Sequence, residues 1–556
     1  MTFEIKRSEI NVMKKIHEIL DNTKDDIQIV FEKGEYHFRE DFYREWFYCL
    51  TSHIGDLNMA FWLNGRKNVT IDGGGSEFIF HGRVTPFMLK DCSDVVLKNF
   101  TIDYDRPFYS QAEILGVNGS EMRLKIEKNF PYRVEGDNLI FYAENWENRL
   151  DKCITMLQEF DVNTKAPAYT SDTILCRIGD DVAVSEDAPL AMKLFKVRDE
   201  GNGEITLYGN MSFGFKPGNK LVFCHEDRIN NAIYVYGCDQ VTLKDIFIRH
   251  SSAFGIMGVI TNDLTIENVS TALDERSKGL VSTNADSVHI IHCTGDLIIR
   301  DCVFENMLDD AVNVHGQFHE IVEITDKNRI KVRCKLWGYN GIETYRVGKK
   351  ININRHGSTY KLGELTVKNV EYLADNDYSD VLLTVEEDVS EELLHCVVEN
   401  YEMMPTLLIQ RVKTGRNRPR GFLIQTNRPV IVEDCEFYNS NFAINITSDC
   451  TYWYESGPVK DVVIRRNKFI NCNYSWGEAP IGITPEYTPC EEAKYYHKNI
   501  RITDNEIHSF TGGMIYAVGV DGLYAWNNKF ILTDAYPKRG DTKKYTLRNC
   551  DNCDLE

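Results

Sequence analysis

The chain has 556 residues, an ordinary apolar share of 43% and a formal net charge of −21 at neutral pH. Such an acidic balance argues against a nucleic-acid partner, because binding to the phosphate backbone requires clustered Lys and Arg. No apolar run approaches the roughly 18 residues of a membrane-spanning helix, so we also expect no membrane partner. The length suggests several domains, although a solenoid can grow long as one unit.

The first predicted element is a short amphipathic helix near the N-terminus. Ser8 could cap it, and its apolar residues fall on one face: Val12, Met13, Ile16, Ile19 and Leu20. Such a helix suits the open end of a solenoid, since terminal repeats need a cap. The start, MTFEIKRSEI, lacks the apolar segment of a signal peptide. We therefore expect either a cytoplasmic protein or an exported one whose signal has been removed.

A short pattern of alternating apolar residues recurs along the chain and ends at Asn or Asp. Its copies read VVLKN, VTLKD, LTIEN, LIIRD, VIVED and, more weakly, VIRR, RITD and YAWN, ending at Asn99, Asp245, Asn268, Asp301, Asp434, Arg466, Asp504 and Asn527. Two of the intervals, 245 to 268 and 504 to 527, are 23 residues long. A unit of this length with variable insertions is typical of a parallel β-helix. Alternation turns the apolar residues inward, and the Asn and Asp positions tolerate left-handed turns.

The pattern stops twice, and both interruptions read as short antiparallel strands and hairpins. Each is long enough for a small β-barrel or sandwich, and the rungs resume after each. We therefore predict an N-terminal cap with the first rungs, a first insertion, central rungs, a second insertion and C-terminal rungs with a tail, at 1–105, 106–229, 230–316, 317–417 and 418–556.

Sixteen cysteines are present, but they form no compact disulfide framework. Several of them, such as Cys92 and Cys435, lie within or beside strand-like repeats, where a small thiol packs like an apolar residue. We expect free core cysteines. The CxxC of Cys550 and Cys553 lacks a partner pair, so we expect no zinc site.

Two strand-like runs, ADSVHI and DDAVNV, place aspartates at equivalent positions 24 residues apart. If the runs occupy consecutive rungs, about 4.8 Å apart, Asp286 lies over Asp310 and His289 lies over Asn313. Asp309 adjoins this pair, so we expect three carboxylates on one wall. Acid–base cleavage of a sugar linkage uses such carboxylates, and inverting enzymes hold acid and base roughly 6.5–9.5 Å apart to admit water.

Two other interpretations of these aspartates remain open. A single Asp in a β-helix turn often caps that turn, and a structural calcium ion is the serious competitor, because carboxylates and amides are hard oxygen ligands. Three acids without basic partners are costly, however, and such clusters are more often functional. We expect no redox or organic cofactor and no metal, with structural calcium as the alternative.

The segment STNADSVHIIHCTG, followed by LDDAVNVHG, resembles the central motif of glycoside hydrolase family 110, the exo-acting α-1,3-galactosidases. Members are right-handed parallel β-helices with two small β-barrel insertions, so the resemblance spans most of the chain. It implies an all-β fold of that kind. It also implies an inverting hydrolase that releases terminal α-1,3-linked galactose, from the blood group B determinant or from linear glycans. By motif position it implies Asp309 as the general acid and Asp286 and Asp310 as the base.

Several other residues are candidates for binding the galactose-terminated oligosaccharide or glycoconjugate. Arg420 could hold the acids charged and donate to hydroxyl groups, and Asn313 and His315 follow the catalytic run, although His315 could equally satisfy a turn carbonyl. Asn445 aligns with Asn313 and suggests an asparagine ladder. The remaining candidates are Asn284, Arg276, Glu478 and His250, together with Trp476, Trp453 and Tyr454, whose rings could stack on a sugar.

Two rival functions would use the same scaffold. A polysaccharide lyase acting on uronates needs calcium or a Lys or Arg base, whereas this wall is acidic. A non-catalytic glycan-binding solenoid would bind without turnover, unchanged by substitution of Asp309. Linear or branched preference, the natural glycan and the oligomeric state stay open, with a homodimer as one expectation.

Overall fold

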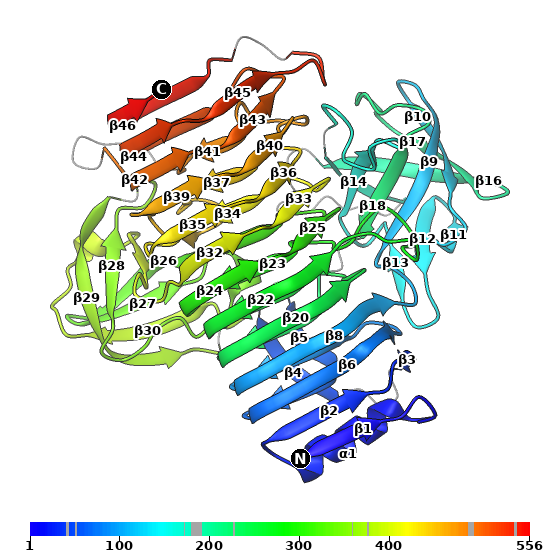
Figure 1. Ribbon diagram of the computed structural model, residues 1–556, viewed down its shortest axis with the longest axis horizontal. Coiled ribbons are helices and arrows are strands. Elements are labelled where there is room, and N and C mark those ends of the chain that lie inside the picture. Colours follow the sequence, from blue (N-terminus) through cyan, green and yellow to red (C-terminus); the bar gives the residue numbers. More distant parts are fainter. Residues whose placement is uncertain are drawn as a thin grey trace.

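The computed structural model describes the chain from residue 1 to 556 except for 40–43, 51–52, 172, 180–191, 226–227, 359, 375–376, 487–493 and 539–541. Parallel strands stack in successive rungs from the N-terminal to the C-terminal end (Figure 1). The chain is therefore a parallel β-helix, as predicted. None of the helices among the described residues is long and apolar enough to span a membrane.

Three stacked series of strands form the solenoid. The first contains β2 (Ile27–Phe31), β6 (Lys67–Phe80), β8 (Ser93–Tyr104), β20 (Asp239–Ile248), β22 (Asn262–Thr271), β24 (Thr294–Arg300), β32 (Thr406–Gln410), β35 (Val430–Glu433), β39 (Val462–Arg465), β42 (His497–Thr503) and β44 (Ile515–Trp526). At its ends lie β1 (Thr2–Ile5) and β46 (Tyr545–Leu555).

The second series joins the far ends of β6, β8, β20 and β22 to shorter strands, namely β3 (Glu35–Phe38), β25 (Val303–Glu305), β33 (Lys413–Gly415), β36 (Glu436–Tyr438), β40 (Lys468–Ile470), β43 (Glu506–Ser509) and β45 (Lys529–Leu532).

The third series carries the aspartates. It contains β5 (His53–Asn64), β7 (Thr85–Lys90), β19 (Ile233–Tyr236), β21 (Ile256–Val259), β23 (Val288–Ile291), β26 (Val312–Asp326), β34 (Phe422–Ile424), β37 (Ile444–Ile446), β41 (Ile481–Ile483) and the start of β44. A further strand, β4 (Arg44–Leu50), pairs antiparallel with β5.

The corner between the first and second series explains the recurring Asn and Asp. All eight predicted positions have a positive φ: Asn99, Asp245, Asn268, Asp301, Asp434, Arg466, Asp504 and Asn527. Asn and Asp tolerate this left-handed conformation better than most residues. The side chains also pair between rungs, since Asn268 Nδ2 donates to Asp245 Oδ1 at 2.6 Å. The repeat in the sequence is therefore a repeat of one turn geometry.

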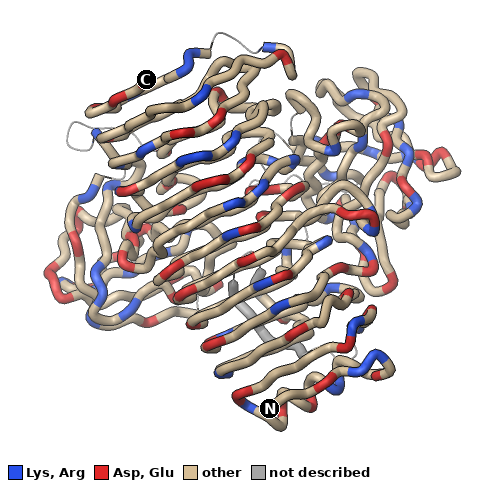
Figure 2. The backbone as a smooth tube through the Cα atoms, in the orientation of Figure 1, with Lys and Arg blue, Asp and Glu red and all other residues tan. Residues whose placement is uncertain are grey.

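The interior and exterior of the solenoid follow the alternation in the sequence. One continuous apolar core runs through the rungs, from Ile5 to Ala525. Fourteen cysteines are free, and most of them are buried, as predicted. Outside, positive and negative side chains are interspersed along the rungs (Figure 2), and Glu267 pairs with both Lys244 and Arg300 on the neighbouring rungs.

The helix α1 (Val12–Asn22) lies at the N-terminal end, and its buried residues are the predicted ones: Val12, Met13, Ile16, Ile19 and Leu20. The expectation that Ser8 caps it is wrong. The cap position is Asn11, and the side chain of Asn11 makes no capping hydrogen bond.

The first insertion contains a closed barrel with its own apolar core. The barrel strands are β9 (Tyr109–Val117), β10 (Glu121–Ile126), β14 (Thr155–Phe160), β15 (Ile174–Ile178), β16 (Lys193–Gly201), β17 (Glu204–Tyr208) and β18 (Lys220–His225). A small sheet accompanies it, made of β11 (Tyr132–Glu135), β12 (Asn138–Tyr142) and β13 (Glu147–Arg149).

The second insertion forms a closed ring of strands that includes β26 of the solenoid. The far half of β26 pairs with β27 (Arg329–Arg333) and β31 (Val397–Glu399). Those two strands connect through β30 (Asp380–Val385), β29 (Lys361–Tyr372) and β28 (Lys350–Asn354), which completes a ring around a separate core. Two 3₁₀ turns, η2 (Trp337–Tyr339) and η3 (Glu391–Leu393), lie in its loops.

The end of this insertion differs from the expected residue 417. The strands β32 and β33 already pair in parallel with β24 and β25. The solenoid therefore resumes at Thr406. The recurring pattern missed this rung because Arg411 follows TLLIQ where the other rungs have Asn or Asp. Arg411 takes the left-handed position there, with φ 52.

Candidate active site

Asp286, Asp310 and Arg420 occupy the same position on three consecutive rungs of the solenoid. Val288 pairs with Val312, and Val312 pairs with Phe422. Because Asp286, Asp310 and Arg420 each lie two residues before these positions, they stack in order along the solenoid. The predicted stacking of Asp286 with Asp310 is confirmed by this register, as is that of His289 with Asn313.

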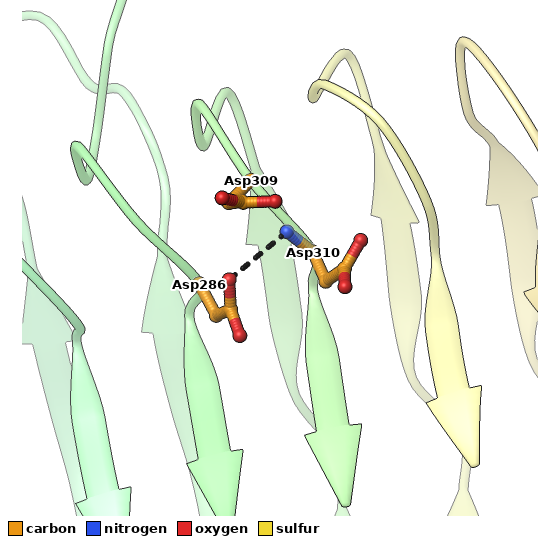
Figure 3. A group of neighbouring side chains, drawn as sticks. All are labelled: Asp286, Asp309 and Asp310. Carbon is orange, nitrogen blue, oxygen red and sulfur yellow. Dashed lines mark hydrogen bonds between the residues drawn. The ribbon is translucent and has the colours of Figure 1, made fainter. Parts of the chain in front are cut away.

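Asp286, Asp309 and Asp310 converge at the start of the two strands (Figure 3). One carboxylate oxygen of each lies within 4.8 Å of one oxygen of each of the others. The backbone N–H of Asp310 donates to Asp286 Oδ1 at 3.2 Å. These distances join single carboxylate oxygens, whereas the separation of roughly 6.5–9.5 Å in inverting enzymes is measured between whole carboxyl groups. The separation of acid and base therefore stays a prediction.

Asp309 lies on the open side of the cluster. Its side chain is 21% exposed, whereas the side chains of Asp286 and Asp310 are 5% and 2% exposed. Arg228 Nη2 donates to Asp309 Oδ2 at 3.0 Å, and Asn417 Nδ2 donates to the Asp309 carbonyl at 2.9 Å. A molecule from solvent therefore meets Asp309 and Arg228 before it meets the two buried acids.

The two buried acids have perturbed protonation. Burial raises the pKa of Asp286 well above its ordinary value, and the charge of Asp309 adds to this effect. Burial also raises the pKa of Asp310, although Arg420 acts against it. Arg420 donates from Nε and from its backbone N–H to Asp310 Oδ1, at 2.9 and 3.2 Å. Two like charges this close repel each other, so ionisation of one carboxyl group makes ionisation of the other less favourable.

Behind Asp286 lies a buried hydrogen-bonded network. His289 Nδ1 lies 2.6 Å from Asp286 Oδ2, and His289 Nε2 lies 3.1 Å from His315 Nε2. Tyr339 OH donates to Glu455 Oε1 at 2.9 Å and lies 3.4 Å from His315 Nε2. Burial lowers the pKa of His289 and of His315 to about 4. Both imidazoles are therefore neutral near pH 7.

Two of the predicted sugar-binding residues hold the backbone instead. His250 Nε2 accepts the N–H of Phe108 at 3.0 Å, and Asn284 Nδ2 donates to the Phe108 carbonyl at 2.9 Å. Both side chains are buried. They fix the segment that enters the first barrel, so sugar binding is the wrong interpretation of their place in the sequence.

Other predicted binding residues lie at varied distances from the cluster. Arg420 contacts the acids as predicted. Asn313 Nδ2 lies 3.4 Å from Glu455 Oε1. His315 Nδ1 donates to the Gly316 carbonyl at 2.6 Å, which matches the turn-carbonyl alternative. Arg276 pairs with Glu35 and Glu77 instead of forming a wall of the site.

The remaining candidates lie on later rungs. Trp476 is 52% exposed in its loop, and Glu478 is also exposed. Trp453 is half exposed and Tyr454 is buried. The direct ladder of Asn313 and Asn445 is wrong, because Leu423 lies between them on the intervening rung.

The three acids at this wall offer carboxylate oxygens, the type of ligand that Ca²⁺ prefers. Arg228 and Arg420 already neutralise the acids and would repel a cation.

Comparison with known proteins places this geometry in a family. A protein-family model described as GLAA-B beta-barrel domain I matches residues 110–221. An alpha-1,3-galactosidase A of Shewanella woodyi is 31% identical over 92% of this chain and 81% of its own length. The chain belongs to glycoside hydrolase family 110. It is thus a glycoside hydrolase.

Further similarities are consistent with this family. An alpha-1,3-galactosidase B of Bacteroides thetaiotaomicron is 30% identical over 98% of this chain and 87% of its own length. Among solved structures, a mannuronan C-5 epimerase A-module of Azotobacter vinelandii has a TM-score of 0.41 at 10% identity, covering 98% of this chain and 96% of its own. That similarity is too weak to bear on function.

Four polar residues of this family 110 site were not assigned from the sequence: Arg228, His289, Tyr339 and Glu455. His289 carried a signal, because it lies only three residues after Asp286 in the same run. Arg228 follows the last strand of the first insertion, and Tyr339 lies in η2 of the second. Glu455 lies in a short strand, β38 (Glu455–Ser456), which pairs antiparallel with β26.

Proposed function

We propose that this glycoside hydrolase releases terminal α-1,3-linked galactose from oligosaccharides or glycoconjugates with inversion at the anomeric carbon. The convergence of Asp309 with a buried, like-charged pair at one corner of the solenoid carries the proposal. The names of the family 110 relatives support galactose as the sugar and α-1,3 as the linkage.

In the proposed reaction, Asp309 protonates the glycosidic oxygen as the bond to the anomeric carbon breaks. A water held by Asp286 and Asp310 attacks that carbon and loses a proton to the pair. The exposed position of Asp309 supports its role as the acid, because the leaving sugar departs toward solvent. The burial of the pair supports its role as the base, because a dry wall strengthens its hold on one water.

Arg420 suits the role of the buried pair as base. Arg420 donates twice to Asp310, which favours a carboxylate that can accept a proton. Arg228 donates to Asp309 and fixes its orientation toward the opening. No metal is needed for these steps, so we expect that dialysis against a chelator leaves galactose release unchanged. Loss of activity that calcium restores would contradict this.

The test is release of galactose from linear α-1,3-galactosyl oligosaccharides and from fucosylated, blood group B type oligosaccharides, measured side by side. We expect free galactose from at least one of them and none from α-1,4- or α-1,6-linked galactosides. The ratio of the two kcat/KM values reports linear or branched preference. Absence of galactose with new ultraviolet absorbance on uronate polymers would instead indicate a lyase.

A further inference from the structure

The protons of the buried network can be assigned from its geometry. His315 Nδ1 lies 2.6 Å from the Gly316 carbonyl, which can only accept, so His315 carries its proton on Nδ1. A neutral His315 then has a bare Nε2. The neighbouring His289 Nε2, at 3.1 Å, must therefore carry the hydrogen that joins the two rings.

The same logic reaches Asp286. Because neutral His289 carries its proton on Nε2, its Nδ1 presents a lone pair. That lone pair lies 2.6 Å from Asp286 Oδ2, and two bare acceptors at this distance would repel each other. A proton must therefore lie between them. The other oxygen, Asp286 Oδ1, accepts the backbone N–H of Asp310, so the proton belongs on Oδ2.

Asp310 has the opposite surroundings. Its Oδ1 receives two donors from Arg420, Nε and the backbone N–H. These two donors favour the ionised form of Asp310. Asp286 Oδ2 instead faces an acceptor, the lone pair of His289 Nδ1, which favours the protonated form of Asp286. The low pKa of His289 and of His315, about 4 for each through burial, fits two neutral rings. Burial raises the pKa of Asp286 and of Asp310 alike, so the donors and acceptors around each carboxyl group, not the pKa, assign the proton to Asp286.

We infer that His289 is a positioning residue that keeps a proton on Asp286, and that Asp310 alone takes the proton of the attacking water. This inference rests on the proposed function. The water oxygen bonds to the anomeric carbon while the glycosidic bond breaks. The leaving oxygen takes the proton of Asp309, and the water proton goes to Asp310. Asp286 keeps its proton and accepts or donates hydrogen bonds only.

Asn is nearly isosteric with a protonated Asp, which gives a direct test. We expect Asp310→Asn to lower kcat roughly 10²–10⁴-fold, the usual worth of a general base. We expect Asp286→Asn to lower kcat only about tenfold, the worth of about one hydrogen bond. An Asp286→Asn loss equal to or larger than the Asp310→Asn loss would overturn the inference.

The role of His289 is tested by pH profiles. His289→Ala removes the acceptor, so Asp286 should lose its proton more readily and the alkaline limb of kcat/KM should move to lower pH. In an Asp286→Asn background the same substitution should leave the limb in place, because residue 286 no longer titrates. His289→Asn, whose carbonyl oxygen can replace Nδ1, should restore the limb. Equal shifts in both backgrounds, or no shift in either, would overturn the inference.

Other titratable and charged groups face Asp286 and His289, and none of them is changed by the His289 substitutions. The groups around Asp286 and His289 are Asp309, Asp310, Arg228, Glu455, Arg420, His315 and Tyr339. Because they are common to the compared proteins, the comparison between backgrounds isolates the contact of His289 with Asp286.

A neutron structure of the wild-type protein separates this inference from the proposed function. We expect deuterium on His315 Nδ1, on His289 Nε2 and on Asp286 Oδ2. A bare Asp286 carboxylate beside a doubly deuterated His289 would overturn the inference, whatever the substrate. Failure of the wild-type protein to release galactose would instead overturn the proposed function and leave the neutron result valid.

Discussion

The two inserted barrels reach the carboxylate cluster in different ways. The first is closed on itself, and His250 and Asn284 hold its entry at Phe108. Arg228, just beyond its last strand, supplies a cation to Asp309. The second barrel shares β26 with the solenoid, so the strand that follows Asp310 also closes the barrel. Its Tyr339 reaches the buried network behind Asp286.

This difference separates an exposed acid side from a buried base side. On the acid side, a partly exposed ion pair orients one carboxyl group. On the base side, a continuous strand and a buried network fix two more. Substitutions in the ion pair should therefore change mainly kcat, whereas those in the buried network should change stability as well.

The largest effect should come from the acid itself. Asp309→Asn should lower kcat on α-1,3-galactosides by roughly 10²–10⁴-fold, because the general acid is lost. Circular dichroism and the melting temperature should stay close to wild type. Asp301→Asn, at an exposed corner paired with Arg411, is the matched control and should retain full activity. Near-wild-type turnover by Asp309→Asn would remove Asp309 from the mechanism.

The next effect should come from the cation on the acid side. Arg228→Ala should lower kcat by about 10–100-fold, since a hydrogen bond to a charged group contributes roughly 1.5–3 kcal/mol. Arg276→Ala is the matched control, because Arg276 pairs with Glu35 away from the cluster. Exposed pairs of that kind contribute about 0–1 kcal/mol. Equal kinetics for the two variants would show that Arg228 does not orient the acid.

On the base side, Tyr339→Phe tests the coupling to the second barrel. It removes a donor to buried Glu455 and should destabilise the protein by about 1.5–3 kcal/mol, seen as a lower melting temperature. Turnover should fall only a few-fold by comparison with Arg228→Ala. Tyr360→Phe, at a half-buried tyrosine in the same insertion, serves as the control. A melting temperature unchanged by Tyr339→Phe would argue that the network does not stabilise the barrel.

The smallest effect concerns the joint of the first barrel. Burial lowers the pKa of His250 from 6.5 to about 3, so the unfolded chain binds a proton at this site that the folded chain does not. Stability contributed by neutral His250 is therefore present above pH 6.5 and is lost as the pH falls toward 3. His250→Gln cannot titrate, so its melting temperature should fall less steeply over this window. Parallel slopes for both proteins would contradict this.

Much of the fold and half of the site were predictable because they depend on local periodicity. The Asn and Asp corners, the stacking of Asp286 with Asp310 and the contact of Arg420 all follow from one register repeated along the chain. Arg228, Tyr339 and Glu455 were not predictable. Arg228 and Tyr339 lie beside or within the two insertions, and Glu455 lies in the short strand β38, which pairs with β26. No sequence period specifies these placements.

The wrong predictions have a related cause. His250 and Asn284 look like site residues because they lie on rungs next to the cluster. A buried backbone N–H and carbonyl at Phe108 also require partners, and these two side chains satisfy them. Sequence proximity to a site cannot distinguish a ligand contact from backbone support. Only the folded junction between the solenoid and the first barrel brings Phe108 to these two side chains.

The most direct measurement of the central claim is the anomeric form of the first galactose released, followed by proton NMR during the first minutes of hydrolysis. Direct attack by a water held between Asp286 and Asp310 predicts β-galactose first, with the α form appearing only by mutarotation. Initial α-galactose would mean retention through a covalent intermediate and would contradict the proposed roles of the three aspartates.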